Sequence, residues 1–217
     1  MSRERWLILG CSPHARDLYP QVRPLCDKVG TVNAGYMIEP APDAYGCFEY
    51  DCYTVEPFKT VCAQMLARKI PCFTRWEEGF PGHIPTRVHA PIGGTIDPGM
   101  PHAVGSGLLM SMNVCAHLNP SEIHYVGFEG YEVGSFYADG LPLYTERDAN
   151  WCIDMNQTTA VWLRLIADFF RDIRFVYHGT PRFQAQQAKR GILEYIAHGT
   201  GEGSPSTIQE AQSSLKA

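Results

Sequence analysis

The sequence has no cluster of basic residues. Its 217 residues include 18 Lys and Arg against 23 Asp and Glu, which gives a formal net charge of −5, and no block of Lys or Arg is longer than a pair. Proteins that bind duplex nucleic acid need clustered cations to displace counterions. We therefore expect no duplex DNA or RNA partner. A free nucleotide is not excluded, because backbone N–H groups and one or two cations can hold it.

Long apolar runs are also missing. The first one, Trp6–Leu9, is only four residues long and follows directly on Met1–Arg5, which is too short for the hydrophobic region of a signal peptide. No later run approaches the ~20 residues that span a bilayer. These absences predict a soluble, cytoplasmic protein with no membrane span.

The cysteines form no C-x-x-C pair. There are eight, and the closest two, Cys47 and Cys52, have four residues between them. Scattered cysteines in a chain without a secretion signal are usually buried thiols. No H-x-x-x-H or H-x-E pattern occurs either, so the sequence predicts no metal site and no disulfide.

Two familiar nucleotide motifs are absent, namely G-x-G-x-x-G and the G-K-[ST] end of a P-loop. Two other segments take their place. The apolar run Trp6–Leu9 stops at Gly10 and turns polar through Cys11, Ser12, Pro13 and His14, and the run from Ile123 stops at Gly127 before Phe128-Glu129-Gly130-Tyr131. A parallel strand brings its carboxyl end to a phosphate in this way. The pair predicts a nucleotide site, although a tight strand-to-helix turn would also explain the first segment.

Strand and helix patterns alternate along the chain, with no internal repeat. They predict an α/β fold, a single Rossmann-like domain over residues 1–198 with a mainly parallel sheet flanked by helices, and a polar, disordered tail over 199–217. The carboxyl ends of such strands share one edge, which would collect Gly10, Asn33, Gly127 and His178. The expected strands are 6–9, 29–33, 50–54, 70–73, 87–90, 123–128 and 173–177, and the expected helices are 14–24, 55–68, 105–117, 158–171 and 184–198.

Several residues near these strand ends are candidates for binding. The turn Gly10-Cys11-Ser12-Pro13 can present the backbone N–H groups of its small residues to a phosphate, and Ser106-Gly107 opens a helix whose unpaired N–H groups favour an anion. Glu129 can receive a ribose or sugar hydroxyl. The simpler interpretations are an ordinary helix start and a solvated acid.

Candidates for catalysis follow the second segment. Tyr131 and Tyr137 could donate phenol hydrogen bonds to a leaving phosphate, although tyrosines in such loops often only pack. Asp154 is a possible general base or a helix-capping acid, as are Asp139 and Asp148. Histidine is the usual base near neutral pH, and His178, which directly follows the last strand, is the strongest of His14, His102 and His178.

These segments together resemble the bacterial sialyltransferases of glycosyltransferase family 42 and the related motility-accessory-factor and pterin-diphosphokinase-like proteins. The resemblance spans residues 6–182 and is carried by short motifs. The matching residues are Gly10 and Pro13 of the first turn, Asn33 with Tyr36, Ser106-Gly107, Val126-Gly127-Phe128-Glu129-Gly130-Tyr131, and Gly134-Ser135-Phe136-Tyr137.

The resemblance implies an inverting, metal-independent transfer of a sugar from a nucleotide-sugar donor, which in the family is CMP-linked, to an unknown acceptor. In the family the two tyrosines bind the phosphate of the leaving nucleotide. The family's catalytic histidine, which precedes the last long helix, is missing here, and Asp154 stands near that position. The family also suggests a homo-oligomer, and the small size is compatible with a phage protein.

Two alternatives remain open at this stage. One is Mg²⁺-dependent diphosphate transfer to a pterin-like alcohol, which needs acids to hold the metal. The other is nucleotide binding without turnover, since the family histidine is absent.

Overall fold

The strands form one parallel sheet. The structure, a computed structural model, describes residues 3–47, 56–74, 84–85, 106–131 and 149–198. The strand order is β5-β4-β3-β2-β1-β6-β7-β8, and every described pair is parallel. The strands are β1 (Arg5–Leu9), β2 (Lys28–Val32), β3 (Ala44–Cys47), β4 (Cys72–Thr74), β5 (Ile84–Pro85), β6 (Glu122–Val126), β7 (Arg174–His178) and β8 (Ile192–Ile196).

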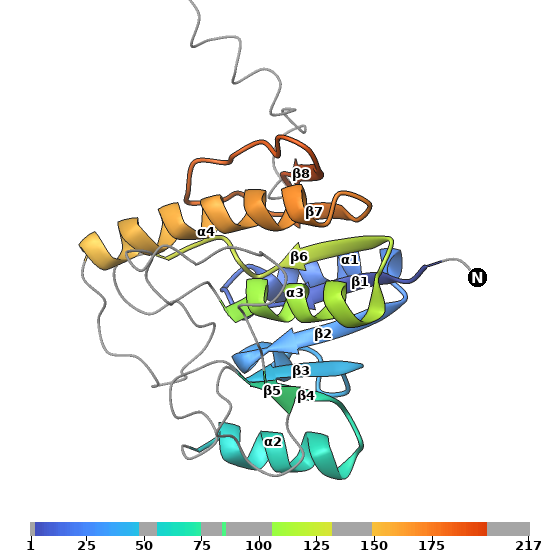
Figure 1. Ribbon diagram of the computed structural model, residues 1–217. Helices are drawn as coiled ribbons and strands as arrows, with labels where there is room; N and C mark the ends of the chain where they lie inside the picture. The colour runs from blue at the N-terminus through green and yellow to red at the C-terminus, as the bar shows by residue number, and fades with distance from the viewer. Residues whose placement is uncertain (1–2, 48–55, 75–83, 86–105, 132–148, 199–217) are drawn as a thin grey trace, which may run out of the picture.

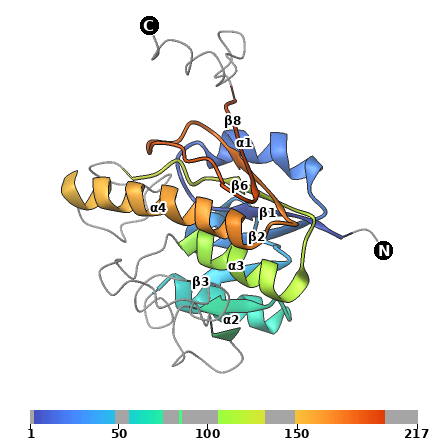
Figure 2. The same cartoon turned by 45° about the horizontal axis from the view of Figure 1, so that its top comes forward.

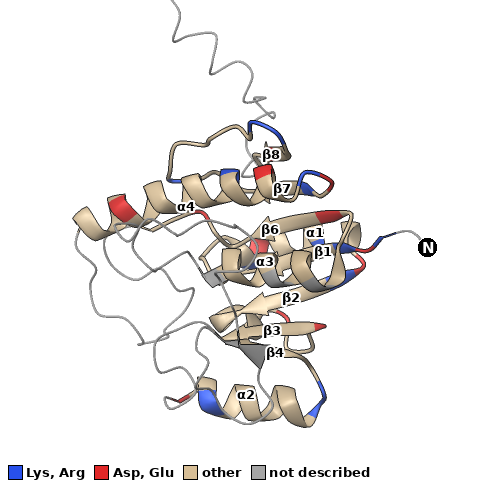
Figure 3. Cartoon of the chain, viewed as in Figure 1, with Lys and Arg blue, Asp and Glu red and all other residues tan. Residues whose placement is uncertain are grey.

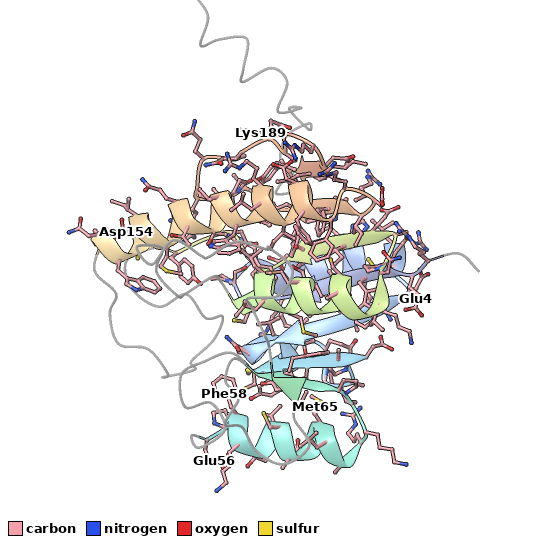
Figure 4. The ribbon with its side chains drawn as sticks, viewed as in Figure 1. Glu4, Glu56, Phe58, Met65, Asp154 and Lys189 are labelled. Atoms are coloured by element: carbon pink, nitrogen blue, oxygen red, sulfur yellow. The ribbon has the colours of Figure 1, made fainter. Side chains whose placement is uncertain are left out.

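Helices cover both faces of this sheet, with α3 and α4 on one face and α1 on the other (Figures 1 and 2). From α2, Phe58 and Met65 point toward the sheet and pack against Tyr45 and Cys72 (Figure 4). The fold is therefore the predicted Rossmann-like α/β arrangement. The helices are α1 (Ala15–Val22), α2 (Phe58–Ala67), α3 (Ser106–Leu118) and α4 (Ala149–Phe169), with 3-10 turns η1 (Arg23–Leu25) and η2 (Asn33–Met37).

The apolar runs of the sequence explain why the sheet is buried on both faces. In β1, Trp6 and Ile8 belong to the core under α3 and α4, while Leu7 and Leu9 belong to the core under α1. Successive side chains of a strand point to opposite faces, so a strand covered on both faces must be apolar throughout. Full burial of such side chains contributes roughly 1.5–3 kcal/mol each.

Charged residues begin four of the strands, at the amino end of the sheet. The first residues of β1, β2, β6 and β7 are Arg5, Lys28, Glu122 and Arg174, and both signs lie close together there (Figure 3). Arg5 pairs with Asp27 at 3.2 Å, Lys28 with Asp43 at 2.9 Å and Arg174 with Glu122 at 3.1 Å. The amino ends of these strands thus carry charges that are paired with side chains of opposite sign.

The helix predicted over 184–198 is wrong. Residues 184–191 are irregular, and Ile192–Ile196 form β8 at the edge of the sheet. A Cβ at Gly191 would lie 1.8 Å from the carbonyl oxygen of Ala167. The backbone before β8 therefore passes directly against α4, which leaves no room there for the side chains of a helix. Leu193 packs into the core and Glu194 pairs with Arg174, which is the alternation of a strand.

Other boundaries also differ from the prediction. The strand β3 at Ala44–Cys47 was not predicted, and the expected strands at 50–54 and 87–90 lie outside the described residues. The last long helix begins at Ala149 rather than at Thr158, and it is the longest described helix at 21 residues. None of the described helices combines the length and the apolar character needed to cross a membrane.

Candidate functional site

The two segments singled out in the sequence meet at the point where the strand order reverses. From β1 the chain proceeds through β2 to β5 on one side, whereas β6 to β8 lie on the other. Leu9 is paired with Val126, and the N–H of Gly10 donates to the carbonyl of Val126 at 2.8 Å. In open α/β sheets, ligands bind outside the carboxyl ends of the strands at this switch point.

Glycine is required where the β1 and β6 ends touch. A Cβ at Gly10 would lie 2.4 Å from the carbonyl oxygen of Gly127 and 2.9 Å from the Phe128 ring. Gly127 itself has φ +85°, a backbone angle that residues with a side chain rarely adopt. Both glycines therefore have a packing reason, and this close contact fixes the position of the two loops relative to each other.

The first loop runs directly into α1. The N–H of Ser12 donates to the carbonyl of Gly127 at 3.4 Å, and the carbonyl of Ser12 accepts from the N–H of Ala15 at 3.0 Å. Ser12 is 8% exposed, and its hydroxyl has no hydrogen-bond partner among the described residues. Cys11 is half-buried and Pro13 is exposed. This turn thus places an unsatisfied hydroxyl beside the start of a helix, where the partial charge favours anions.

The carboxylate of Glu129 is buried without a hydrogen-bond partner among the described residues. The residue is 4% exposed, and neither side-chain oxygen has a hydrogen bond within the described part of the chain. Its position is fixed by the N–H of Arg182, which donates to the Glu129 carbonyl at 2.6 Å, and its oxygen Oε1 lies 3.4 Å from where a Cβ of Gly179 would be. A buried unpaired polar group costs about 1–3 kcal/mol, more if charged, so this carboxylate needs an explanation.

Asn33 lies at the neighbouring strand end, as predicted. It follows β2, is 2% exposed and adopts φ +49°, and its carbonyl accepts from the Tyr45 hydroxyl at 3.2 Å. The turn that it begins crosses the end of β1, because a Cβ at Gly35 would lie 2.5 Å from the carbonyl oxygen of Leu9. The ends of β1, β2 and β6 are therefore in contact at one edge.

The start of α3 packs against the second loop. A Cβ at Gly107 would lie 1.9 Å from the ring of Phe128. Gly107 must therefore lack a side chain for the Phe128 ring to pack against α3, and this packing explains the glycine without a ligand. Ser106 is the first residue of α3, and its side chain is outside the described part of the structure.

Tyr131 is held by α4. Its N–H donates to Oδ1 of Asn156 at 2.7 Å, and Nδ2 of Asn156 donates to its carbonyl at 2.9 Å. The rings of Tyr131 and Trp151 meet edge to face, with centroids 5.0 Å apart. The second predicted tyrosine, Tyr137, lies outside the described residues.

The two candidate bases differ in access. Asp154 is exposed on the end of α4 that extends past the carboxyl edge of the sheet (Figure 4). His178 is 1% exposed, and both of its ring nitrogens lie 2.8 Å from nitrogens of other histidines, His124 and His198. Burial, together with the charges of the neighbouring rings and of Arg174, lowers the pKa of His178 to about 3.

Sequence reasoning missed Asn156, Trp151 and the partners of His178. Asn156 and Trp151 were placed before the predicted helix, so no face of α4 was assigned to them. His124 stands two residues after Glu122 in β6, and this period-two spacing puts both on one face. Reading 192–196 as a strand would have added His198 to the same side of the sheet.

Within the described residues, no group of three His, Cys, Asp or Glu side chains is placed to hold a metal ion. Comparison with protein-family models, with curated proteins and with solved structures finds no significant match to this chain. The case for a function therefore depends on the residues at the carboxyl edge.

Proposed function

We propose that this chain binds a nucleotide-sugar at the carboxyl edge of β1, β2 and β6 and transfers the sugar to an acceptor hydroxyl, with inversion and without a metal. The observation that carries the proposal is the buried carboxylate of Glu129, which has no partner among the described residues and follows the switch-point strand β6.

The chemistry of a nucleotide suits the unsatisfied groups. A ribose or sugar supplies hydroxyl donors, and a carboxylate only accepts hydrogen bonds, so two hydroxyls would satisfy the oxygens of Glu129. The hydroxyl of Ser12 and the start of α1 suit a phosphate, which accepts hydrogen bonds and carries negative charge. One ligand of this kind would remove both desolvation costs.

The transfer step assigns roles to three residues. The acceptor oxygen attacks the anomeric carbon and forms the glycosidic bond, while the bond from that carbon to the phosphate oxygen breaks. The electron pair of that bond leaves with the phosphate, whose charge the phenols of Tyr131 and Tyr137 would stabilise by donating hydrogen bonds. The acceptor proton goes to the carboxylate of Asp154, which is exposed and open to an acceptor.

His178 receives no role as a base in this proposal. A base must reach the proton that it removes, and both ring nitrogens of His178 are already engaged with other histidines in the interior. Asp154 is the more accessible of the two predicted candidates.

A thermal-shift screen against nucleoside mono- and diphosphates and their sugars, with and without Mg²⁺, tests the binding step. A ligand at a hundredfold excess over its Kd stabilises the fold by about 2.7 kcal/mol, which raises the Tm by several degrees. We expect a cytidine nucleotide to do so without Mg²⁺ and the variant Glu129→Gln to lose the shift. The matched control is Glu4→Gln, an exposed acid at the opposite edge of the sheet (Figure 4).

Product analysis tests the transfer step. We expect the donor sugar to move to an acceptor without added metal, and Tyr131→Phe to lower kcat while nucleotide binding is retained. A shift that appears only with purine nucleotides and Mg²⁺ would instead favour diphosphate transfer. Tight binding with the donor recovered intact would show a binding protein, and no shift with any nucleotide would remove the proposed site.

A further inference from the structure

Three histidine rings form a continuous chain on the α1 face of the sheet, from β6 through β7 to the end of β8. Nδ1 of His124 lies 2.8 Å from Nε2 of His178, and Nδ1 of His178 lies 2.8 Å from Nε2 of His198. The His124 and His178 rings are stacked, with centroids 5.1 Å apart and planes 17° apart. The three histidine rings are thus linked by two nitrogen–nitrogen contacts at hydrogen-bond distance.

Both ends of the chain meet oxygen atoms that accept hydrogen bonds. At the outer end, Nδ1 of His198 lies 3.2 Å from Oε1 of Gln21 in α1. The orientation of this amide is fixed, because its Nε2 donates to the carbonyl of Asp17 at 2.9 Å. At the inner end, Nε2 of His124 lies 3.2 Å from a carboxylate oxygen of Glu122.

Counting protons sets a limit on what the closed chain can hold. It has four contacts, namely Gln21–His198, His198–His178, His178–His124 and His124–Glu122. Each contact can hold one proton and has no room for two, so without an extra proton one of the four contacts has none. Three neutral imidazoles carry three ring protons, and three charged ones carry six. The closed chain therefore accommodates one extra proton, and a second would place two N–H groups against each other.

We propose that the chain of His124, His178 and His198 is an acid-sensitive latch between the end of β8 and α1. The latch is closed when these histidines hold at most one extra proton, and it opens when they take up more. It opens at His198, because this ring is half-buried at the end of the edge strand, whereas His178 and His124 are buried. The proposal does not depend on the function proposed above.

The charges around the chain are nearly balanced. Glu122 faces His124, but its carboxylate is shared with Arg174 of β7 at 3.1 Å, and Arg174 also binds Glu194 of β8. Arg5 of β1 adds a further positive charge that acts on His124, and α1 contributes the neutral Gln21. The carboxylates of Glu122 and Glu194 are offset by Arg174 and Arg5, so they offer little net compensation for two or three imidazolium charges.

The direction of the pKa shifts agrees with opening in acid. Burial lowers the pKa of His124, His178 and His198 in the closed chain below the ordinary value of 6.5. A released histidine regains that ordinary value, so opening takes up protons once the pH is below about 6.5. The closed state is favoured above this pH and is lost as the pH falls.

Opening has a local consequence at the end of β8. The N–H of Gly179 donates to the carbonyl of Ile196 at 2.9 Å, two residues before His198. Gly179 follows His178 directly, so this hydrogen bond and the histidine contact join the same two strand ends. Release of His198 would expose the amides at this edge before those of the central strands.

Native-state hydrogen exchange between pH 7.5 and 4.5, corrected for the intrinsic rate, tests the latch. Each proton taken up on opening raises the opening constant tenfold per pH unit. We expect the β8 amides to open between tenfold and a hundredfold more readily per pH unit below pH 6, while the β1 amides change by less than about threefold. In the wild-type protein, the ring nitrogens of His124, His178 and His198, followed by NMR, should titrate together over the same pH range.

Two variants separate the latch from general acid sensitivity. His198→Gln removes the outer ring and the proton that it takes up, so we expect the pH dependence at β8 to fall by one proton, a factor of ten per pH unit below the wild-type value. His14→Gln replaces an exposed histidine that lies outside the chain and should keep the wild-type slope. Equal loss of protection in β1 and β8 at every pH, or an unchanged slope in His198→Gln, would overturn the proposal.

Discussion

The side-chain amide of Asn156 pairs with both backbone groups of Tyr131, accepting from its N–H at 2.7 Å and donating to its carbonyl at 2.9 Å. A side chain of α4 thereby replaces a strand partner for the loop that follows β6. The contact also explains Gly130, which has φ +107° and whose Cβ would lie 2.6 Å from Oδ1 of Asn156. The proposed phosphate-binding tyrosine is thus positioned by the longest helix.

Removing this amide should destabilise the fold and release Tyr131. We expect Asn156→Ala to lower the free energy of unfolding by about 1–3 kcal/mol, because two backbone groups lose their partners. The neighbouring, exposed Gln157→Ala should change it by less than about 0.5 kcal/mol. Urea unfolding measures both. Equal stabilities for the two variants would mean that water replaces the amide without cost.

The contact between Gly10 and Gly127 should tolerate no side chain. In Gly10→Ala the new methyl group would meet a backbone carbonyl at 2.4 Å, whereas in Gly30→Ala it would meet the flexible end of Met110 at 2.8 Å. Overpacking of this kind typically costs about 1–3 kcal/mol. We expect Gly10→Ala to be the less stable variant by at least about 1 kcal/mol in urea unfolding. The reverse order would show that the two loops can separate without loss.

The sequence was sufficient to predict a mainly parallel sheet flanked by helices and the ends of β1 and β6, because apolar runs that stop at glycine have few alternatives in an α/β protein; β3 was not predicted. It failed where tertiary contacts decide. Residues 184–198 have helical composition, yet the passage of Gly191 against α4 and the pairing of Glu194 with Arg174 make Ile192–Ile196 a strand. At the site, Gly10, Asn33 and Gly127 do share one edge. Neither the burial of Glu129 nor the Asn156 contact has a signature in the local sequence.

The carboxylate of Glu129 should lower the stability of the unliganded protein. It is buried without a hydrogen bond among the described residues, and burying an unpaired charge is costly. We therefore expect Glu129→Gln to raise the free energy of unfolding, measured in urea, by about 1–2 kcal/mol. The same variant should lose nucleotide binding. Glu4→Gln, at an exposed position, keeps a side-chain oxygen that can accept from Nε1 of Trp6 and should change the free energy of unfolding by less than about 0.5 kcal/mol. A less stable Glu129→Gln would show that the carboxylate has a structural partner.

A thiol in the first loop offers a direct test of where the ligand lies. Among the described cysteines Cys11 alone is half-buried, and the others are buried. Burial raises the pKa of Cys26 and of Cys72 to about 12, so these thiols carry almost no thiolate at neutral pH and should react slowly. In a Cys52→Ser background, which removes a cysteine outside the described residues, we expect one fast-reacting thiol, and it should disappear in Cys11→Ser. A nucleotide bound beside Ser12 should slow the labelling of Cys11 at least tenfold without changing the slow phase. Unchanged labelling at saturating nucleotide would place the ligand away from the turn between β1 and α1, because a phosphate at the start of α1 must cover the residue that precedes Ser12.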